Sequence, residues 1–205
     1  MKFDIKSYCR ITNKKVLLNG TEVPIIRSEE PNSLWLNDVY RSFGIQYLKF
    51  FKMDNLSKAG FLGAELVCRD VGLDINVPNK DISIVCFNRS SSLDDDIIYQ
   101  QTIQDKNNYF PSPAVFVYTL ANIVTGEIAI RNKIMGESSF YITEKFSPKQ
   151  ISEAIYDIFR NNYVNGLLCG WTEYFKDNCD VLMMFITRNN KSGKEITTEL
   201  ISKLY

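Results

Sequence analysis

The chain has 205 residues, 45% of them hydrophobic and 23% charged, so it can bury a sizeable core and has the composition of a globular protein. Its 24 basic residues equal its 24 acidic ones, which predicts no nucleic-acid partner, and no apolar run is long enough for a membrane span. Five scattered cysteines and a charged N-terminal segment predict reduced thiols and a cytoplasmic location. The chain has no histidine, so it lacks the commonest general base and metal ligand.

The first quarter of the chain is rich in turn signals. Residues 1–26 alternate loosely between apolar and polar, with breaks at Asn13 and Gly20, and this predicts antiparallel hairpins that decorate an edge. Residues 27–48 are polar and predict a loop that contains one short helix.

A long helix is predicted to begin at Asp54 or Ser57 and to end at Gly72. It carries small residues that let another element approach its backbone, namely Ala59, Gly60, Gly63 and Ala64. The apolar run 81–87 then predicts a buried parallel strand with Cys86 in the core.

Three consecutive carboxylates, Asp94 to Asp96, invite a metal-site hypothesis. No further ligands converge near them in sequence. Ser92 is better interpreted as a helix N-cap, which places the three carboxylates in the first helical turn, where the helix dipole favours anions. No metal or other cofactor is therefore expected.

Residues 109–143 form a nearly continuous apolar stretch around which the fold is expected to be organised. Asn122 is predicted to cap a helix that runs to about Lys133, with Gly126 allowing close packing. Gly136 is expected to end the turn, and Ser138 to Thr143 to form a short buried strand.

The run Ser147-Pro148-Lys149-Gln150 has the form of a helix start, and the apolar stripe that follows predicts a helix to about Asn162 with a charged opposite face. Residues 166–170 and 180–187 predict two strands joined by a connection from Trp171 to Asn178, and a last helix is predicted at 194–203 after Ser192-Gly193. The alternation of strands and helices predicts an α/β fold with a mixed, mainly parallel sheet flanked by helices.

Three segments together resemble a known family. They are FFKMDNLSKAGFLGAELV at 50–67, ISIVCFNRSSSLDDDIIYQQTI at 82–103, and SPAVFVYTLANIVTGEIAIRNKIMGESSFYI in the central stretch. In this order they resemble the N-terminal half of β-ketoacyl-acyl carrier protein synthases, which have the thiolase-like fold. The resemblance covers roughly residues 45 to 190. It implies that residues 1–205 form a single domain like one half of that fold, with 1–26 as a hairpin decoration.

The resemblance also implies where a nucleophile would lie. The synthases place a cysteine after the strand that matches Ser138–Thr143, against a helix N-terminus that lowers the thiol pKa. Counted from Gly136, this position falls on or beside Lys145, and no cysteine lies within twenty residues of it. A protonated lysine cannot accept an acyl group as a thiolate does. The family's remaining catalytic groups come from a C-terminal half that has no counterpart in this sequence.

Two cysteines are alternative nucleophiles. Cys169 is flanked by apolar residues and is expected to be buried and inert, whereas Cys179 is expected in a turn and exposed. Without a base neither makes a convincing site, so no catalytic residue is predicted.

The family pairs subunits through the strand that matches 138–143, so Phe140 and Tyr141 are candidate interface residues, either in a homodimer or against a catalytic synthase. An acyl carrier protein is a further expected partner. The predicted function is that of a non-catalytic synthase-like protein, comparable to a chain-length factor, which assists fatty-acid, polyene or polyketide-type chain elongation. Two alternatives remain: a condensing enzyme or acyltransferase completed by a partner chain, or an interaction module unrelated to acyl chemistry.

Overall fold

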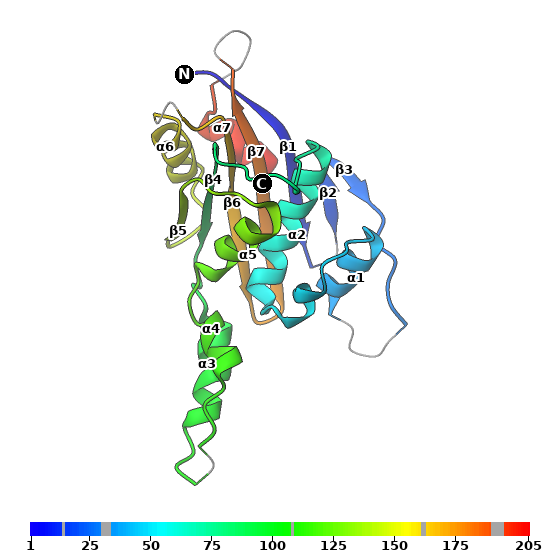
Figure 1. Cartoon of the computed structure of the whole chain (residues 1–205), viewed down its shortest axis with the longest axis vertical. Coiled ribbons are helices and arrows are strands. Elements are labelled where there is room, and N and C mark those ends of the chain that lie inside the picture. Colours follow the sequence, from blue (N-terminus) through cyan, green and yellow to red (C-terminus); the bar gives the residue numbers. More distant parts are fainter. Residues whose placement is uncertain (14, 30–33, 108, 161–162, 190–194) are drawn as a thin grey trace.

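A computed structural model describes residues 1–13, 15–29, 34–107, 109–160, 163–189 and 195–205. Its strands form one sheet with the order β3-β2-β1-β7-β6-β4-β5, and helices cover both faces (Figure 1). The strands are β1 (Phe3–Thr12), β2 (Val16–Leu18), β3 (Thr21–Val23), β4 (Ile82–Asn88), β5 (Ser138–Ile142), β6 (Gly166–Phe175) and β7 (Asn178–Arg188). The predicted α/β fold with a mixed sheet is confirmed.

The expectation that parallel pairing dominates the sheet is wrong. Strand β4 pairs in parallel with β5 and β6, whereas β1–β2, β2–β3, β1–β7 and β6–β7 are antiparallel. The strands that pair only in antiparallel fashion come from the two ends of the chain. Strand β1 is no decoration, because it pairs with β7 from Phe3 opposite Arg188 to Thr12 opposite Asp180. Of the described residues in 1–26, only strand β3 lies at an edge of the sheet, and β2 joins it to β1.

Two helical layers enclose the sheet. Helices α1 (Trp35–Ser42), α2 (Asn55–Asp70) and α5 (Ile123–Asn132), with a 3₁₀ turn at Leu48–Lys52, pack on one face. Helices α6 (Pro148–Ile158) and α7 (Thr198–Leu204) pack on the other. Strand β7 serves both cores, since Val181 and Met183 face the α2 side while Leu182 and Met184 face the α6 side. No helix among the described residues has the length and apolarity needed to cross a membrane.

Small residues of α2 allow the close packing that the sequence predicts. Asp54 caps the helix, with its carboxylate accepting from the Leu56 N–H at 3.0 Å. A Cβ atom at Gly60 would lie 2.4 Å from a methyl group of Val124, so α5 lies directly against this position. The prediction for α5 itself is wrong in two details, because a Cβ at Gly126 would meet nothing within 4 Å and the side chain of its N-cap residue, Asn122, makes no capping bond.

The C-terminal strands differ most from the prediction. Strands β6 and β7 form a long hairpin that turns at Lys176 and Asp177, with φ of 48° and 59°. The predicted connection from Trp171 to Asn178 is therefore wrong. Helix α7 begins at Thr198 and is capped by Thr197, later than predicted. The predicted first residue, 194, lies outside the described residues, as does the Ser192-Gly193 pair before it. Helix α6 ends at Ile158, four residues before the predicted end.

Helices α3 (Leu93–Ile103) and α4 (Pro113–Tyr118) form an arm that projects away from the sheet (Figure 1). The hydroxyl of Ser92 does not cap α3 but donates to the carbonyl of Thr119 at 2.6 Å, which joins the two ends of the arm. Asp95, in the first turn of α3, is 8% exposed and lies against Asp54. No metal-binding group of three or more acidic or cysteine side chains is present among the described residues.

Candidate functional site

The candidate site is the loop that joins strand β5 to helix α6. At its start, the Thr143 N–H donates to the carbonyl of Asn88 at 2.8 Å, and the Thr143 hydroxyl donates to the carbonyl of Lys145 at 3.1 Å. At its end, the hydroxyl of Ser147 accepts from the Gln150 N–H at 3.4 Å, so the predicted helix start is confirmed. The loop therefore presents position 145 next to the positive end of α6.

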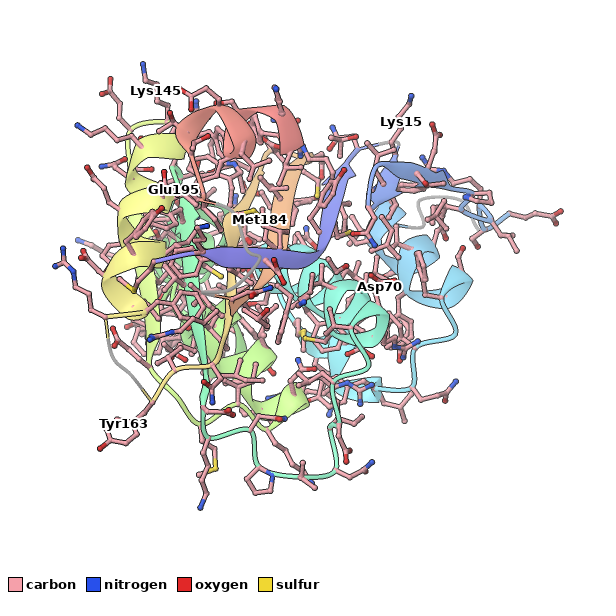
Figure 2. All side chains as sticks on the ribbon, turned by 90° about the horizontal axis from the view of Figure 1, so that it is seen from above. Lys15, Asp70, Lys145, Tyr163, Met184 and Glu195 are labelled. Carbon is pink, nitrogen blue, oxygen red and sulfur yellow. The ribbon has the colours of Figure 1, made fainter. Side chains whose placement is uncertain are left out.

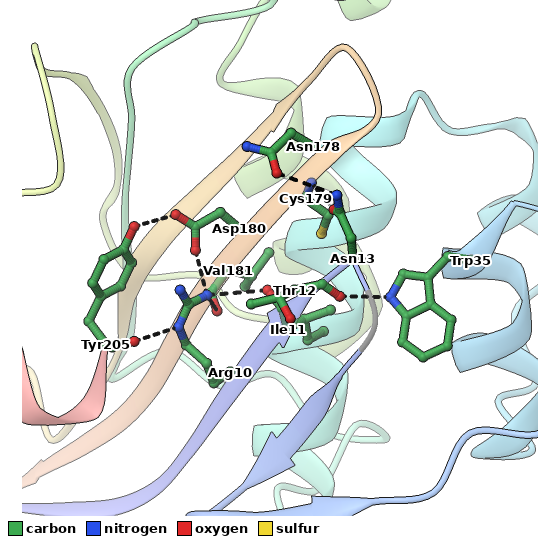
Figure 3. A network of polar contacts seen from close by, with 10 residues as sticks. All are labelled: Arg10, Ile11, Thr12, Asn13, Trp35, Asn178, Cys179, Asp180, Val181 and Tyr205. Atoms are coloured by element: carbon green, nitrogen blue, oxygen red, sulfur yellow. Dashed lines mark hydrogen bonds and ion pairs between the residues drawn. The ribbon is translucent and has the colours of Figure 1, made fainter.

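Aromatic stacking fixes the loop from the side. The ring of Phe146 stacks on Tyr205 with centroids 3.7 Å apart and meets Trp171 edge to face at 5.8 Å. Figure 3 shows how Tyr205 is held in turn: its hydroxyl donates to Asp180, and its carbonyl accepts from Nε of Arg10 at 2.9 Å. The backbone beside position 145 is thus anchored to the sheet on both sides.

The side chain at this anchored position is an exposed lysine. Lys145 lies at the rim of the molecule, in contrast to Met184 in its interior (Figure 2). A thiolate here would gain from the helix dipole, whereas an ammonium group gains nothing from it. Position 145 supplies no thiol, and its role as the place of a nucleophile stays a prediction.

All five cysteines are buried. Cys169 is completely buried in β6, as predicted, and burial raises its pKa well above the ordinary value. The prediction that Cys179 is exposed in a turn is wrong, since it is 3% exposed in β7 and burial raises its pKa to about 12. Burial likewise raises the pKa of Cys9 and of Cys86 to about 12 and that of Cys68 still further. None of these thiols forms a thiolate near neutral pH.

Strand β5 is the last strand of the sheet and has one unpaired edge in the part of the chain described. The prediction that it is buried is wrong, because Tyr141 is 46% and Ile142 59% exposed. On the side of β4, the chain packs closely just before the strand begins. A Cβ at Gly136 would lie 2.2 Å from the carbonyl oxygen of Ile82. Because the amide of Thr143 points to β4 and successive residues alternate, the N–H of Ile142 points outward from the free edge.

The two candidate interface residues lie on opposite faces of β5. Phe140 is half-buried and packs against the α2–α5 core. Tyr141 faces α6 and stacks on Phe87 with ring centroids 5.1 Å apart. Beside Tyr141, a groove of about 410 Å³ runs between β5 and α6, and Glu137, Glu153 and Asp157 are among its lining residues.

The arm of α3 and α4 exposes a concentration of large apolar side chains, so the expectation that the whole of 109–143 organises the fold is wrong for its first part. Its exposed residues are Leu93, Ile97, Ile98, Tyr109, Phe110, Phe116, Val117 and Leu120. Phe110, near its tip, is 75% exposed. Such a concentration on one protruding element is typical of a surface that contacts another protein. The signal in the sequence is the apolar content of 109–120, which resembles that of a core segment.

The chain resembles known proteins in structure but not in sequence. No protein-family model and no curated protein matches the sequence. Among solved structures, the ishigamide ketosynthase/chain length factor superposes with a TM-score of 0.66 at 10% identity, over 94% of this chain and 64% of the matched chain. The ketosynthase ApeO in complex with its chain length factor ApeC from Xenorhabdus doucetiae gives a TM-score of 0.60 at 12% identity, over 92% of this chain and 80% of the other.

A third match is AntDE:AntF, a type II PKS acyl-carrier protein in complex with its ketosynthase bound to the hexaketide. Its TM-score is 0.60 at 12% identity, over 92% of this chain and 63% of that one. The present chain thus spans less than two thirds of the length of two of these three matched chains. At such identities the likeness establishes the architecture: this chain has the fold of the ketosynthases and chain length factors.

Proposed function

We propose that this chain is a non-catalytic ketosynthase-like subunit that pairs with a catalytic ketosynthase in a carrier-protein-dependent chain-elongation pathway, in the manner of a chain length factor. Residues 1–205 act as a single domain that resembles one half of the synthase fold, and the cytoplasm is the expected compartment. The observation that carries the proposal is the anchored loop with an exposed lysine, Lys145, where an acyl-accepting thiolate would lie.

Burial of the five cysteines supports the absence of acyl transfer, since thiols with strongly raised pKa values are poor nucleophiles. The chain also contains no histidine that would take a proton from such a thiol. The alternative of a condensing enzyme completed by a partner would require that partner to supply both the sulfur and the base.

The free edge of β5 and the apolar arm support a subunit role. An unpaired edge strand is a template for a strand of another chain, and natural monomers normally protect such edges. The exposed Tyr141 and Ile142 offer apolar contact at this edge. The protruding arm adds a second surface that water solvates poorly.

Coexpression with each catalytic ketosynthase of the same genome tests the pairing. Tagged wild-type chain is expected to retain one of them in a complex of defined stoichiometry by size-exclusion chromatography with light scattering. Ile142→Pro removes an outward N–H without touching the ladder to β4 and should abolish the complex, whereas Ile142→Val should retain it. Copurification that is equally strong with Ile142→Pro would refute pairing through this edge.

A further inference from the structure

The groove beside β5 carries negative charge. Its lining combines aromatic and aliphatic surface from Phe87, Tyr141 and Ile142 with the carboxylates of Glu137, Glu153 and Asp157. Among the described residues that line it there is no lysine or arginine. The groove is therefore apolar along the strand and acidic along its helical wall.

Two cations flank the groove without lining it. Lys149 lies 3.9 Å from Glu153 on helix α6, and Arg160, two residues beyond the end of that helix, lies 3.0 Å from Asp157. All four side chains are more than 60% exposed, so these pairs are weak and leave their carboxylates accessible. Glu137 accepts a hydrogen bond from the Ser139 hydroxyl at 3.1 Å and remains exposed.

The position of the groove decides which partner fits. Two copies of this chain that paired antiparallel through β5 would be related by a dyad perpendicular to the sheet, which places both α6 helices on one side of it. The two acidic grooves would then lie next to each other across the dyad, and carboxylate would face carboxylate. Like charges brought together at an interface oppose association and suppress the wrong partner.

We propose that this groove receives a lysine or arginine side chain of a different polypeptide whose strand adds to the free edge of β5, and that it selects against a second copy of this chain. The inference rests on the proposed pairing through β5 and specifies its partner: a heterologous chain with a basic residue beside the paired strand. The aliphatic part of a lysine or arginine side chain packs on Tyr141 and Ile142, while its charged end meets the acidic wall.

A charge-reversed copy of the chain provides the probe. The variant Glu153→Lys/Asp157→Lys is purified with a distinguishable mass tag and mixed with wild type, and homodimers and heterodimers are quantified by native mass spectrometry and sedimentation. The mixed pair is expected to bind about tenfold or more tightly than either pair of identical copies, and to weaken in about 0.5 M salt. Introducing Ile142→Pro into either copy should abolish the mixed pair, and circular dichroism confirms that each variant is folded.

A matched control carries the same change of charge at the other edge of the sheet. Glu22→Lys/Asp70→Lys alters two exposed carboxylates and should bind wild type no more tightly than wild type binds itself. Glu22 lies 3.5 Å from Lys15, and Asp70, at the end of α2, accepts from the side-chain amide of Asn19 at 2.8 Å. Absence of the mixed dimer, a wild-type homodimer of equal affinity, or equal binding by the control would overturn the inference.

Different results would refute the proposed function and the proposed specificity of the groove. A tight wild-type homodimer overturns the selection against self-pairing but leaves the non-catalytic subunit role intact. Mixed pairing without any ketosynthase complex keeps the groove's specificity and refutes the proposed function.

Discussion

Glu65 offers a quantitative test of how the fold positions the edge strand. This carboxylate on α2 is 2% exposed and accepts from Arg131 of α5 at 2.7 and 2.8 Å and from Arg69 at 2.8 Å. Since α5 leads directly into β5, the Glu65–Arg131 pair fixes the segment that delivers the edge strand. Burial alone would raise the pKa of Glu65, but hydrogen bonds and the charges of both arginines outweigh it and lower the pKa below 4.5.

The substitution Glu65→Gln keeps the shape and removes the charge. Breaking a buried pair costs about 3–5 kcal/mol, and because the side chain of Arg69 is 41% exposed while that of Arg131 is 13% exposed, only Arg131 is left buried and unpaired. We therefore expect a loss of about 3 kcal/mol in the free energy of unfolding, or roughly 6–12 °C in Tm. Urea denaturation and thermal melts monitored by circular dichroism measure it.

The pH dependence and a control sharpen the result. A carboxyl group whose folded-state pKa is lowered stabilises the protein above its unfolded pKa, so the wild-type advantage should shrink as the pH falls below 4.5. Glu153→Gln removes an exposed partner of Lys149 and should cost less than about 0.5 kcal/mol. A cost below about 1 kcal/mol for Glu65→Gln at neutral pH would refute the reasoning.

Three further predictions concern other parts of the molecule. Burial and the adjacent Asp54 raise the pKa of Asp95 to about 8, so the folded state holds its proton more tightly than the unfolded one and wild-type stability falls as the pH rises from about 4 to about 8. Asp95→Asn should consequently gain more in Tm over wild type at about pH 8 than at about pH 5, and an equal difference at both would contradict this. Gly136→Ala brings a methyl group against the carbonyl of Ile82 and should lower the unfolding free energy by about 1–3 kcal/mol, whereas Gly126→Ala on the open side of a helix should raise it by roughly 0.5–1 kcal/mol; urea titrations that ranked them the other way would be decisive against the packing described. In the folded chain a small thiol reagent should modify none of the five buried cysteines until denaturant is added, and one rapidly labelled cysteine at neutral pH would show that burial had been misjudged.

The elements with strong local signals were predictable from the sequence. Asp54 marks the start of α2, and the Ser147-Pro148 pair marks the start of α6, because capping and a fixed φ act within a few residues. The burial of Cys86 in β4 follows from its uninterrupted apolar run, which a strand covered on both faces requires.

Other features depend on contacts that local patterns do not encode. The β6–β7 turn uses Lys176 and Asp177 at positive φ, without the glycine or asparagine that normally signals such a turn. The sequence therefore predicts Cys179 to be exposed, although it is buried in β7. Apolar composition does not distinguish a buried strand from an exposed one, which is why the sequence predicts that β5 is buried. The interface role of Phe140 and Tyr141 stays a prediction. Glu137 and Asp157 both line the acidic groove but come from different segments of the chain. No single segment of the sequence therefore predicts the groove.

The most direct test of the central claim is the intact mass of the chain after incubation with an acyl thioester donor, alone and in complex with a catalytic ketosynthase. The account predicts that this chain keeps its unmodified mass while the ketosynthase gains the acyl group. A stoichiometric acyl adduct on this chain, mapped to Lys145 or to any of the five cysteines, would contradict it.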